Sequence, residues 1–94
     1  MGTNQFAGTR YVEFKLADFP VNLVTDTAGP QNGPAVEIIV TLAGGGVLEV
    51  IFADGSTSTI DNAAGLIGVP LSGLVTDITT NTTVGAVLVT WSYP

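Results

Sequence analysis

The chain has 94 residues, with no cysteine, no histidine, two basic residues and eight acidic residues, for a net charge of -6. This length supports one domain, and the missing residue types exclude disulfides, the usual zinc sites and nucleophiles activated by histidine. The negative charge argues against a nucleic-acid partner, because phosphate binding needs several Lys or Arg side chains.

The composition is unusually apolar for so small a chain. Apolar residues make up 46% of it before its 12 glycines are counted, and charged residues make up 11%, where about 25% is usual. A small domain has a large surface for its volume and needs proportionally more polar side chains. The surplus therefore predicts that protein partners, including further copies of the chain, cover part of the surface.

The sequence shows no membrane or export signal. No run approaches the roughly 18 apolar residues of a membrane span, and the first residues lack the charged and apolar regions of a signal peptide. We therefore expect no membrane partner and synthesis in the cytoplasm without a signal peptide.

Residues 1–9 are predicted to form a flexible N-terminal arm, followed by a single β domain over residues 10–94. The arm has no apolar period and contains several turn-forming residues. Residues 10–16, RYVEFKL, then alternate between apolar and polar side chains, which is typical of a half-buried strand. The face predicted to be buried carries Val12, Phe14 and Leu16.

A long loop separates the next two predicted strands. Residues 21–25, VNLVT, follow Pro20, and residues 26–34, DTAGPQNGP, are mostly turn formers. Residues 35–42, AVEIIVTL, form the next strand. Its buried face is predicted to carry Val36, Ile38, Val40 and Leu42.

The clearest predicted hairpin is centred on Asp54-Gly55. Three glycines at 44–46 turn the chain into the strand 47–53, and the Asp-Gly pair suits a two-residue type I′ turn into the strand 56–60. Such a turn pairs Phe52 with Thr57 and Val50 with Thr59. The returning strand, STSTI, is polar enough to face water or a wet interface.

Two further strands complete the prediction. Residues 61–68 indicate a loop or a single helical turn, residues 69–78 a strand interrupted at Pro70, and residues 84–91 a final strand after the turn formers NTT. Seven to eight short strands and no amphipathic helix predict an all-β fold. We expect a compact antiparallel sandwich or jelly roll, or a small barrel.

Asp26 is the first candidate for chemistry. DTAG at 26–29, AGGG at 43–46 and LIG at 66–68 resemble, in order, the signature, flap and apolar-apolar-Gly motif of retroviral-type aspartic proteases. Ala28 stands where that signature has Gly, and its side chain would crowd the close approach of two subunits. We therefore interpret Asp26 as an ordinary loop residue, keep a retropepsin-like protease as the least favoured alternative, and expect no enzyme activity.

Other polar motifs are weak as sites. Asp54, Asp61 and Asn62 lack the alternating acidic ligands of a calcium loop, so no metal is expected. NTT at 81–83 fits a glycosylation sequon, yet turn chemistry explains it better in a chain without an export signal.

Trp91 and Tyr93 are two residues apart and would share one face of a terminal strand. Aromatic side chains placed in this way stack on sugar rings in carbohydrate-binding modules. A glycan-binding β-sandwich module is therefore kept as an alternative, although a Trp in a terminal strand is more often core or interface.

Residues 47–91 show a particular order of features: an apolar strand, FADGSTSTI, DNAAG, VPL, a second apolar strand and a short strand ending in Trp91. In this order the chain resembles small structural proteins of tailed-phage virions, both head decoration or cement proteins and head-spike-base proteins. The resemblance covers about half of the chain.

The resemblance implies a non-enzymatic protein, made in the host cytoplasm, that binds the exterior of an assembled capsid in the virion and stabilises it. The implied partners are the major capsid protein and further copies of the chain, with a trimer favoured and a pentameric head-spike base at the vertices as the alternative. No cofactor is implied. The residues predicted at lattice or subunit contacts are Phe6, Tyr11, Pro30, Pro34, Trp91 and Tyr93.

Overall fold

The computed structural model describes residues 9–25 and 34–92, and this part of the chain is all-β, as predicted. None of the described residues belongs to a helix long and apolar enough to cross a membrane. The elements are β1 (Thr9–Lys15), η1 (Leu16–Asp18), β2 (Val21–Asn22), β3 (Ala35–Leu42), β4 (Leu48–Phe52), β5 (Thr57–Ile60), η2 (Ala63–Leu66), β6 (Leu71–Ile78) and β7 (Ala86–Ser92), where η marks a short 3₁₀ helix.

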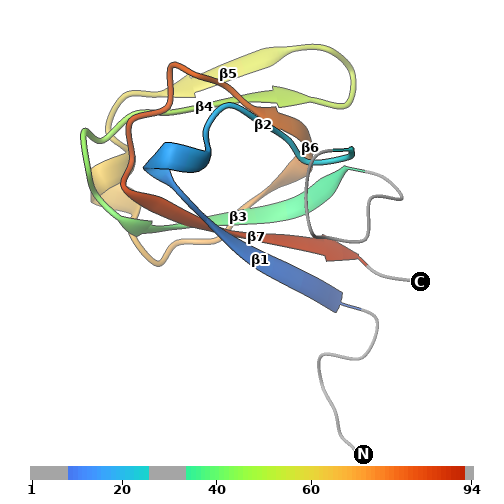
Figure 1. Ribbon diagram of the computed structural model, residues 1–94, viewed down its shortest axis with the longest axis horizontal. Coiled ribbons are helices and arrows are strands. Elements are labelled where there is room, and N and C mark those ends of the chain that lie inside the picture. The colour runs from blue at the N-terminus through green and yellow to red at the C-terminus, as the bar shows by residue number, and fades with distance from the viewer. Residues whose placement is uncertain (1–8, 26–33, 93–94) are drawn as a thin grey trace, which may run out of the picture.

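The seven strands form one antiparallel sheet in the order β1-β7-β3-β6-β4-β5, with β2 paired to the end of β6. The sheet curls, and Figure 1 shows the β4–β5 hairpin on the opposite side of the domain from β1, β3 and β7. β1 and β5 are therefore the two ends of this strand order among the described residues, and β2 is a short strand with β6 as its one described partner.

The core lies inside this curl and is built almost entirely from aliphatic side chains. β7 contributes most densely, because Ala86, Val87, Val89 and Trp91 are all buried. The other buried apolar residues are Phe14, Val21, Leu23, Ala35, Ile38, Val40, Leu48, Val50, Ala63, Val75, Ile78 and Val84.

Two strands depart from the predicted alternation at their ends. In β1 the buried face continues through Phe14, but the strand ends at Lys15 and Leu16 begins η1, half exposed. In β3 the register shifts between Ala35 and Glu37 and again between Val40 and Leu42. These irregularities change which side chains face the core.

As a result, the predicted buried face of β3 was wrong at both ends. Ala35 is buried in place of Val36, which is half-buried, and Leu42 is 58% exposed. Ile38 and Val40 are buried as predicted.

The hairpin forms at the predicted place, but its register was predicted wrongly by one residue. Val50 pairs with Ser58 and Ile51 with Thr57. The loop has three residues, since the Phe52 N–H donates to the Ser56 carbonyl at 2.8 Å and the Gly55 N–H to the Phe52 carbonyl at 2.9 Å. Gly55 has a φ of 89°, as the last residue of such a loop requires. The shift turns Ser58 and Ile60 toward the interior.

Candidate functional site

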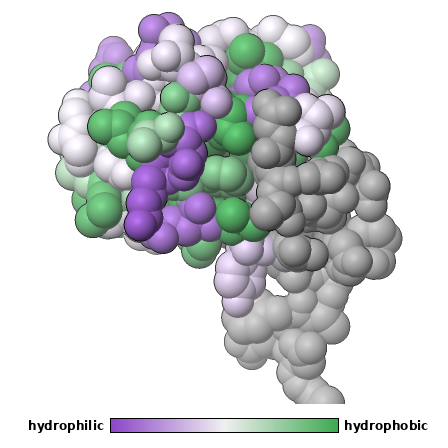
Figure 2. All heavy atoms as spheres, in the orientation of Figure 1, coloured by the Kyte–Doolittle hydropathy of each residue, from purple (hydrophilic) through white to green (hydrophobic). Residues whose placement is uncertain are grey.

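Four large apolar side chains are exposed at one end of the sheet. Leu16 is 49% exposed, Leu42 58%, Ile67 47% and Val69 43%. We call these four residues the apolar end. Figure 2 shows apolar residues on the left side of the molecule, where Figure 1 places the end of β3 and η2.

Backbone hydrogen bonds hold the apolar end together. Gly85 lies between two of its members: its carbonyl accepts from the Leu16 N–H at 3.0 Å, and its N–H donates to the Leu42 carbonyl at 2.9 Å. On the other side of β3, the Gly68 N–H donates to the Val40 carbonyl at 3.0 Å. This bond brings Ile67 and Val69 beside the end of β3.

Sequence reasoning missed this surface because it assigned Leu16 and Leu42 to the core. Both are exposed where the regular strand stops: Leu16 opens η1, and Leu42 follows the register shift in β3. Period-two alternation carries no signal for such an irregularity. The composition carried a signal for exposed apolar residues in general, since its apolar surplus is more than one small core can hide.

A second feature that sequence reasoning missed is a polar cluster around Glu49. One carboxylate oxygen accepts from the Thr59 hydroxyl at 2.7 Å, and the other accepts from the Thr79 hydroxyl at 2.7 Å and the Asn81 side-chain amide at 2.8 Å. These hydrogen bonds, with Thr59 contributing most, hold the pKa of Glu49 below its usual value of 4.5. The cluster ties β4, β5 and the turn after β6 together.

This arrangement predicts that acid weakens the fold. Because the pKa of Glu49 is lower in the folded chain than in the unfolded one, the unfolded chain takes up the proton first as the pH falls. The contribution of Glu49 is present above the unfolded pKa, near 4.5, and is lost as the pH falls through the lowered folded-state pKa. Urea unfolding followed through Trp91 fluorescence, between about pH 6 and about pH 3, measures this loss.

The matched variants are Glu49→Gln and Glu13→Gln. Each removes one carboxylate, but Glu13 lies exposed on β1, away from this cluster. Below about pH 4.5 we expect the urea midpoint to fall less steeply for Glu49→Gln than for the wild type or for Glu13→Gln. If the urea midpoint fell equally steeply with pH in all three proteins, the Glu49 cluster would not contribute to the acid sensitivity of the fold.

The residues considered for calcium do not form a site. Asp54 lies at the tip of the β4–β5 hairpin, where its carboxylate accepts from the Ser56 N–H at 2.9 Å and the Ser56 hydroxyl at 2.6 Å. Both hydrogen bonds lower the pKa of Asp54, and the bond from the Ser56 hydroxyl contributes more than the bond from the Ser56 N–H. Asp61 and Asn62 follow β5 at the other end of the strand. Within the described ranges, no group of three or more acidic residues is placed to hold a metal ion.

Three of the six predicted contact residues lie in the described part of the chain, and they differ in exposure. Trp91 is 1% exposed, its indole N–H donates to the Leu23 carbonyl at 3.1 Å, and its ring packs edge-on against Phe14. Its ring therefore offers no surface to a sugar or a subunit. Tyr11 is half exposed on β1, and Pro34 is half-buried before β3. Phe6, Pro30 and Tyr93, together with Asp26 of the protease motif, lie outside the described residues.

Comparison with known proteins adds no assignment. No family model matches the chain, and no significant match is found among curated proteins or solved structures.

Proposed function

We propose that the chain is a non-enzymatic structural protein that binds neighbouring protein subunits through its apolar end, and that it serves as a decoration or cement protein on the exterior of a phage capsid. The observation that carries the proposal is the exposure of Leu16, Leu42, Ile67 and Val69 at one end of the sheet. Apolar side chains gathered in this way typically mark a protein contact.

The free energy available from burying the apolar end suits a protein that binds in many copies. Fully burying a Leu, Ile or Val side chain is worth about 1.5 to 3 kcal/mol, and these four side chains are already about half buried. One apolar end therefore gives a modest contact. A protein that binds only the assembled shell stabilises it by mass action, and self-association multiplies the number of contacts made by each particle.

The order of features over residues 47–91, which resembles that of small tailed-phage virion proteins, supports a capsid as the binding target. The proposed partners are therefore the major capsid protein and further copies of this chain, with a trimer favoured. A pentameric head-spike base uses the same surface with a different symmetry, and the mass of the assembled species distinguishes the two.

Self-association should depend on Leu42 and not on Leu74. The two leucines are matched in exposure, at 58% and 55%, but Leu74 lies on β6 outside the apolar end. The 9.6-kDa chain should form an oligomer at micromolar concentration. Leu42→Asp should weaken its association at least about tenfold, which corresponds to about 1.4 kcal/mol, while Leu74→Asp should leave it unchanged.

Native mass measurement and sedimentation equilibrium on the three proteins provide the test. Near-identical circular dichroism spectra would establish that both variants are folded. A monomeric wild type, or equal association of the two variants, would contradict the role given to the apolar end.

The capsid partner is tested by co-sedimentation with particles of the phage that carries the gene. The chain should pellet with assembled shells and not with unassembled shell protein, and Leu42→Asp should pellet less than Leu74→Asp. Binding to neither form of the shell protein would remove the capsid assignment, even if the chain self-associates.

A further inference from the structure

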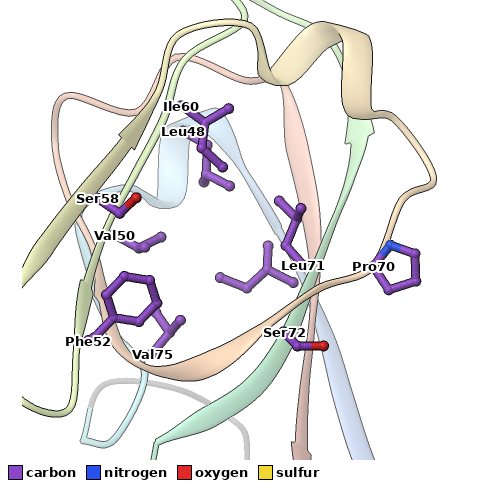
Figure 3. Close-up of a pocket in the computed structure, with 10 residues that line it drawn as sticks. Leu48, Val50, Phe52, Ser58, Ile60, Pro70, Leu71, Ser72 and Val75 are labelled. Atoms are coloured by element: carbon purple, nitrogen blue, oxygen red, sulfur yellow. The ribbon is translucent and has the colours of Figure 1, made fainter.

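A cavity of about 410 Å³ lies inside the curl of the sheet, between the β4–β5 hairpin on one side and β3 and β6 on the other. Figure 3 shows Leu48, Val50, Ile60 and Leu71 directed into this space from both sides. Its floor is buried and apolar, whereas Pro70 and Ser72 at its rim are exposed. The cavity therefore opens to the surface between β5 and the start of β6.

Among the described residues, no charged side chain lines the cavity. Its polar side chains are the hydroxyls of Ser58 and Ser72, and the rest of the lining is aliphatic, aromatic or proline. A charged group placed there would lose its hydration without gaining an ionic partner. The lining thus selects neutral, apolar groups.

β5 borders the cavity, and one of its two backbone edges is not paired with any described strand. The register pairs Val50 with Ser58, and the Phe52 N–H donates to the Ser56 carbonyl, so Ser56, Ser58 and Ile60 direct their backbone groups toward β4. The N–H and carbonyl groups of Thr57 and Thr59 therefore point away from β4. No described strand pairs with β5 on that side.

The open edge and the cavity meet on the same strand, and we propose that together they bind one extended apolar segment of a partner protein. The segment adds a strand to β5 through the backbone groups of Thr57 and Thr59. Because side chains alternate along a strand, every second residue of the segment then points toward the cavity, on the same face as Ser58 and Ile60.

β1 and β5, the two ends of the strand order, differ in a way that favours strand addition at β5. At the end of β1 the carboxylate of Asp18 accepts from the Lys15 N–H at 2.8 Å, which occupies a donor at that edge. β1 also exposes the charged side chains of Glu13 and Lys15. Charges and capped donors protect an edge against strand addition. β5 has no charged residue, and Ile60 lines the cavity.

A small apolar molecule is the alternative occupant. A volume of this size suits such a ligand. It would leave the outward backbone groups of β5 unused, however, whereas an added strand uses both the edge and the cavity. The inference goes beyond the apolar end and does not depend on it, since its test uses the isolated chain without particles.

The test begins with selection of 12-residue peptides from a random display library on the full-length chain. We expect the enriched peptides to alternate apolar and polar residues over about five positions, with few charges. The best of them is synthesised, and its binding is measured by titration calorimetry and by the exchange of the Thr57 and Thr59 amide hydrogens, which should slow on binding.

Thr57→Pro and Thr57→Ala form the matched pair. Proline removes an outward N–H that β4 does not use, and alanine keeps that donor while removing the same hydroxyl. Thr57→Ala should bind the synthetic peptide like the wild type, and Thr57→Pro at least tenfold more weakly. Ser58→Trp, which fills the cavity, should also weaken peptide binding at least tenfold. This variant tests the proposal if Thr57→Pro fails to fold.

Several outcomes would overturn the proposal. The selection could enrich no peptide, or only peptides without alternation, or the enriched peptide could bind all the variants equally. A titration with the neutral dye Nile red covers the alternative occupant. If saturable dye binding is lost in Ser58→Trp while no peptide binds, the cavity is a small-molecule site and the strand-addition proposal is wrong.

Discussion

Replacing Trp91 with alanine should lower the free energy of unfolding by about 3 to 5 kcal/mol, the range for truncating a fully buried aromatic side chain. Trp91 is 1% exposed, packs against Phe14 with ring centroids 6.4 Å apart, and donates its indole N–H to the Leu23 carbonyl. Its removal leaves a large cavity beside β7 and a buried carbonyl without that partner. Urea and thermal unfolding, monitored by circular dichroism, measure the loss.

Trp91→Phe separates the two contributions. Trp91→Phe keeps a ring in the core but loses the hydrogen bond to the Leu23 carbonyl. Its free energy of unfolding should therefore lie between that of the wild type and that of Trp91→Ala. A loss below about 1 kcal/mol for Trp91→Ala would be incompatible with the buried position. A folded Trp91→Ala variant that lost only sugar binding would return the glycan-binding alternative.

The second large effect is expected at Gly44. Its φ is 50°, in the left-handed region, and an added Cβ would lie 2.5 Å from the Thr83 carbonyl oxygen and 2.8 Å from the Val84 carbonyl carbon. The atoms in the way are backbone and cannot rotate aside. Gly44→Ala should therefore cost about 1 to 2 kcal/mol for the conformation and about 1 to 3 more for the overpacking.

Gly55→Ala is the control for the conformational part. Gly55 also has a positive φ, of 89°, but an added Cβ there would meet nothing within 4 Å. Its substitution should cost about 1 to 2 kcal/mol. Urea unfolding of the two variants gives the difference directly. Equal losses would mean that the turn at Gly44 can move away from residues 83–85 at no cost.

Gly44 also connects stability with the proposed contact surface. The Gly45 N–H donates to the Thr83 carbonyl at 2.7 Å, and the Leu42 carbonyl accepts from the Gly85 N–H at 2.9 Å, so the turn after β3 and the chain before β7 pack as one unit. Leu16 and Leu42 both bond to Gly85 within that unit. A variant that loosens the turn should therefore disturb the apolar end as well.

The polar turn before β7 shows what local sequence signals can and cannot indicate. NTT at 81–83 predicted a turn, and the Thr82 N–H does donate to the Thr79 carbonyl at 3.1 Å. No local signal placed Asn81 beside Glu49, which is 32 residues away, yet the Asn81 side-chain amide donates to the Glu49 carboxylate at 2.8 Å. That contact depends on the pairing of β4 with β6, a long-range event.

The class of fold and the positions of most strands could be predicted from local signals, namely the alternation of apolar residues and the Gly, Pro and Asp-Gly turns. The face that several side chains show depends instead on contacts between residues far apart in the chain. A three-residue loop in place of a two-residue one turned Ser58 and Ile60 inward, and strand ends and register shifts turned Leu16 and Leu42 outward. One residue of register reverses the faces of a strand, and the register depends on the geometry of the turn as well as on the strand's own apolar pattern.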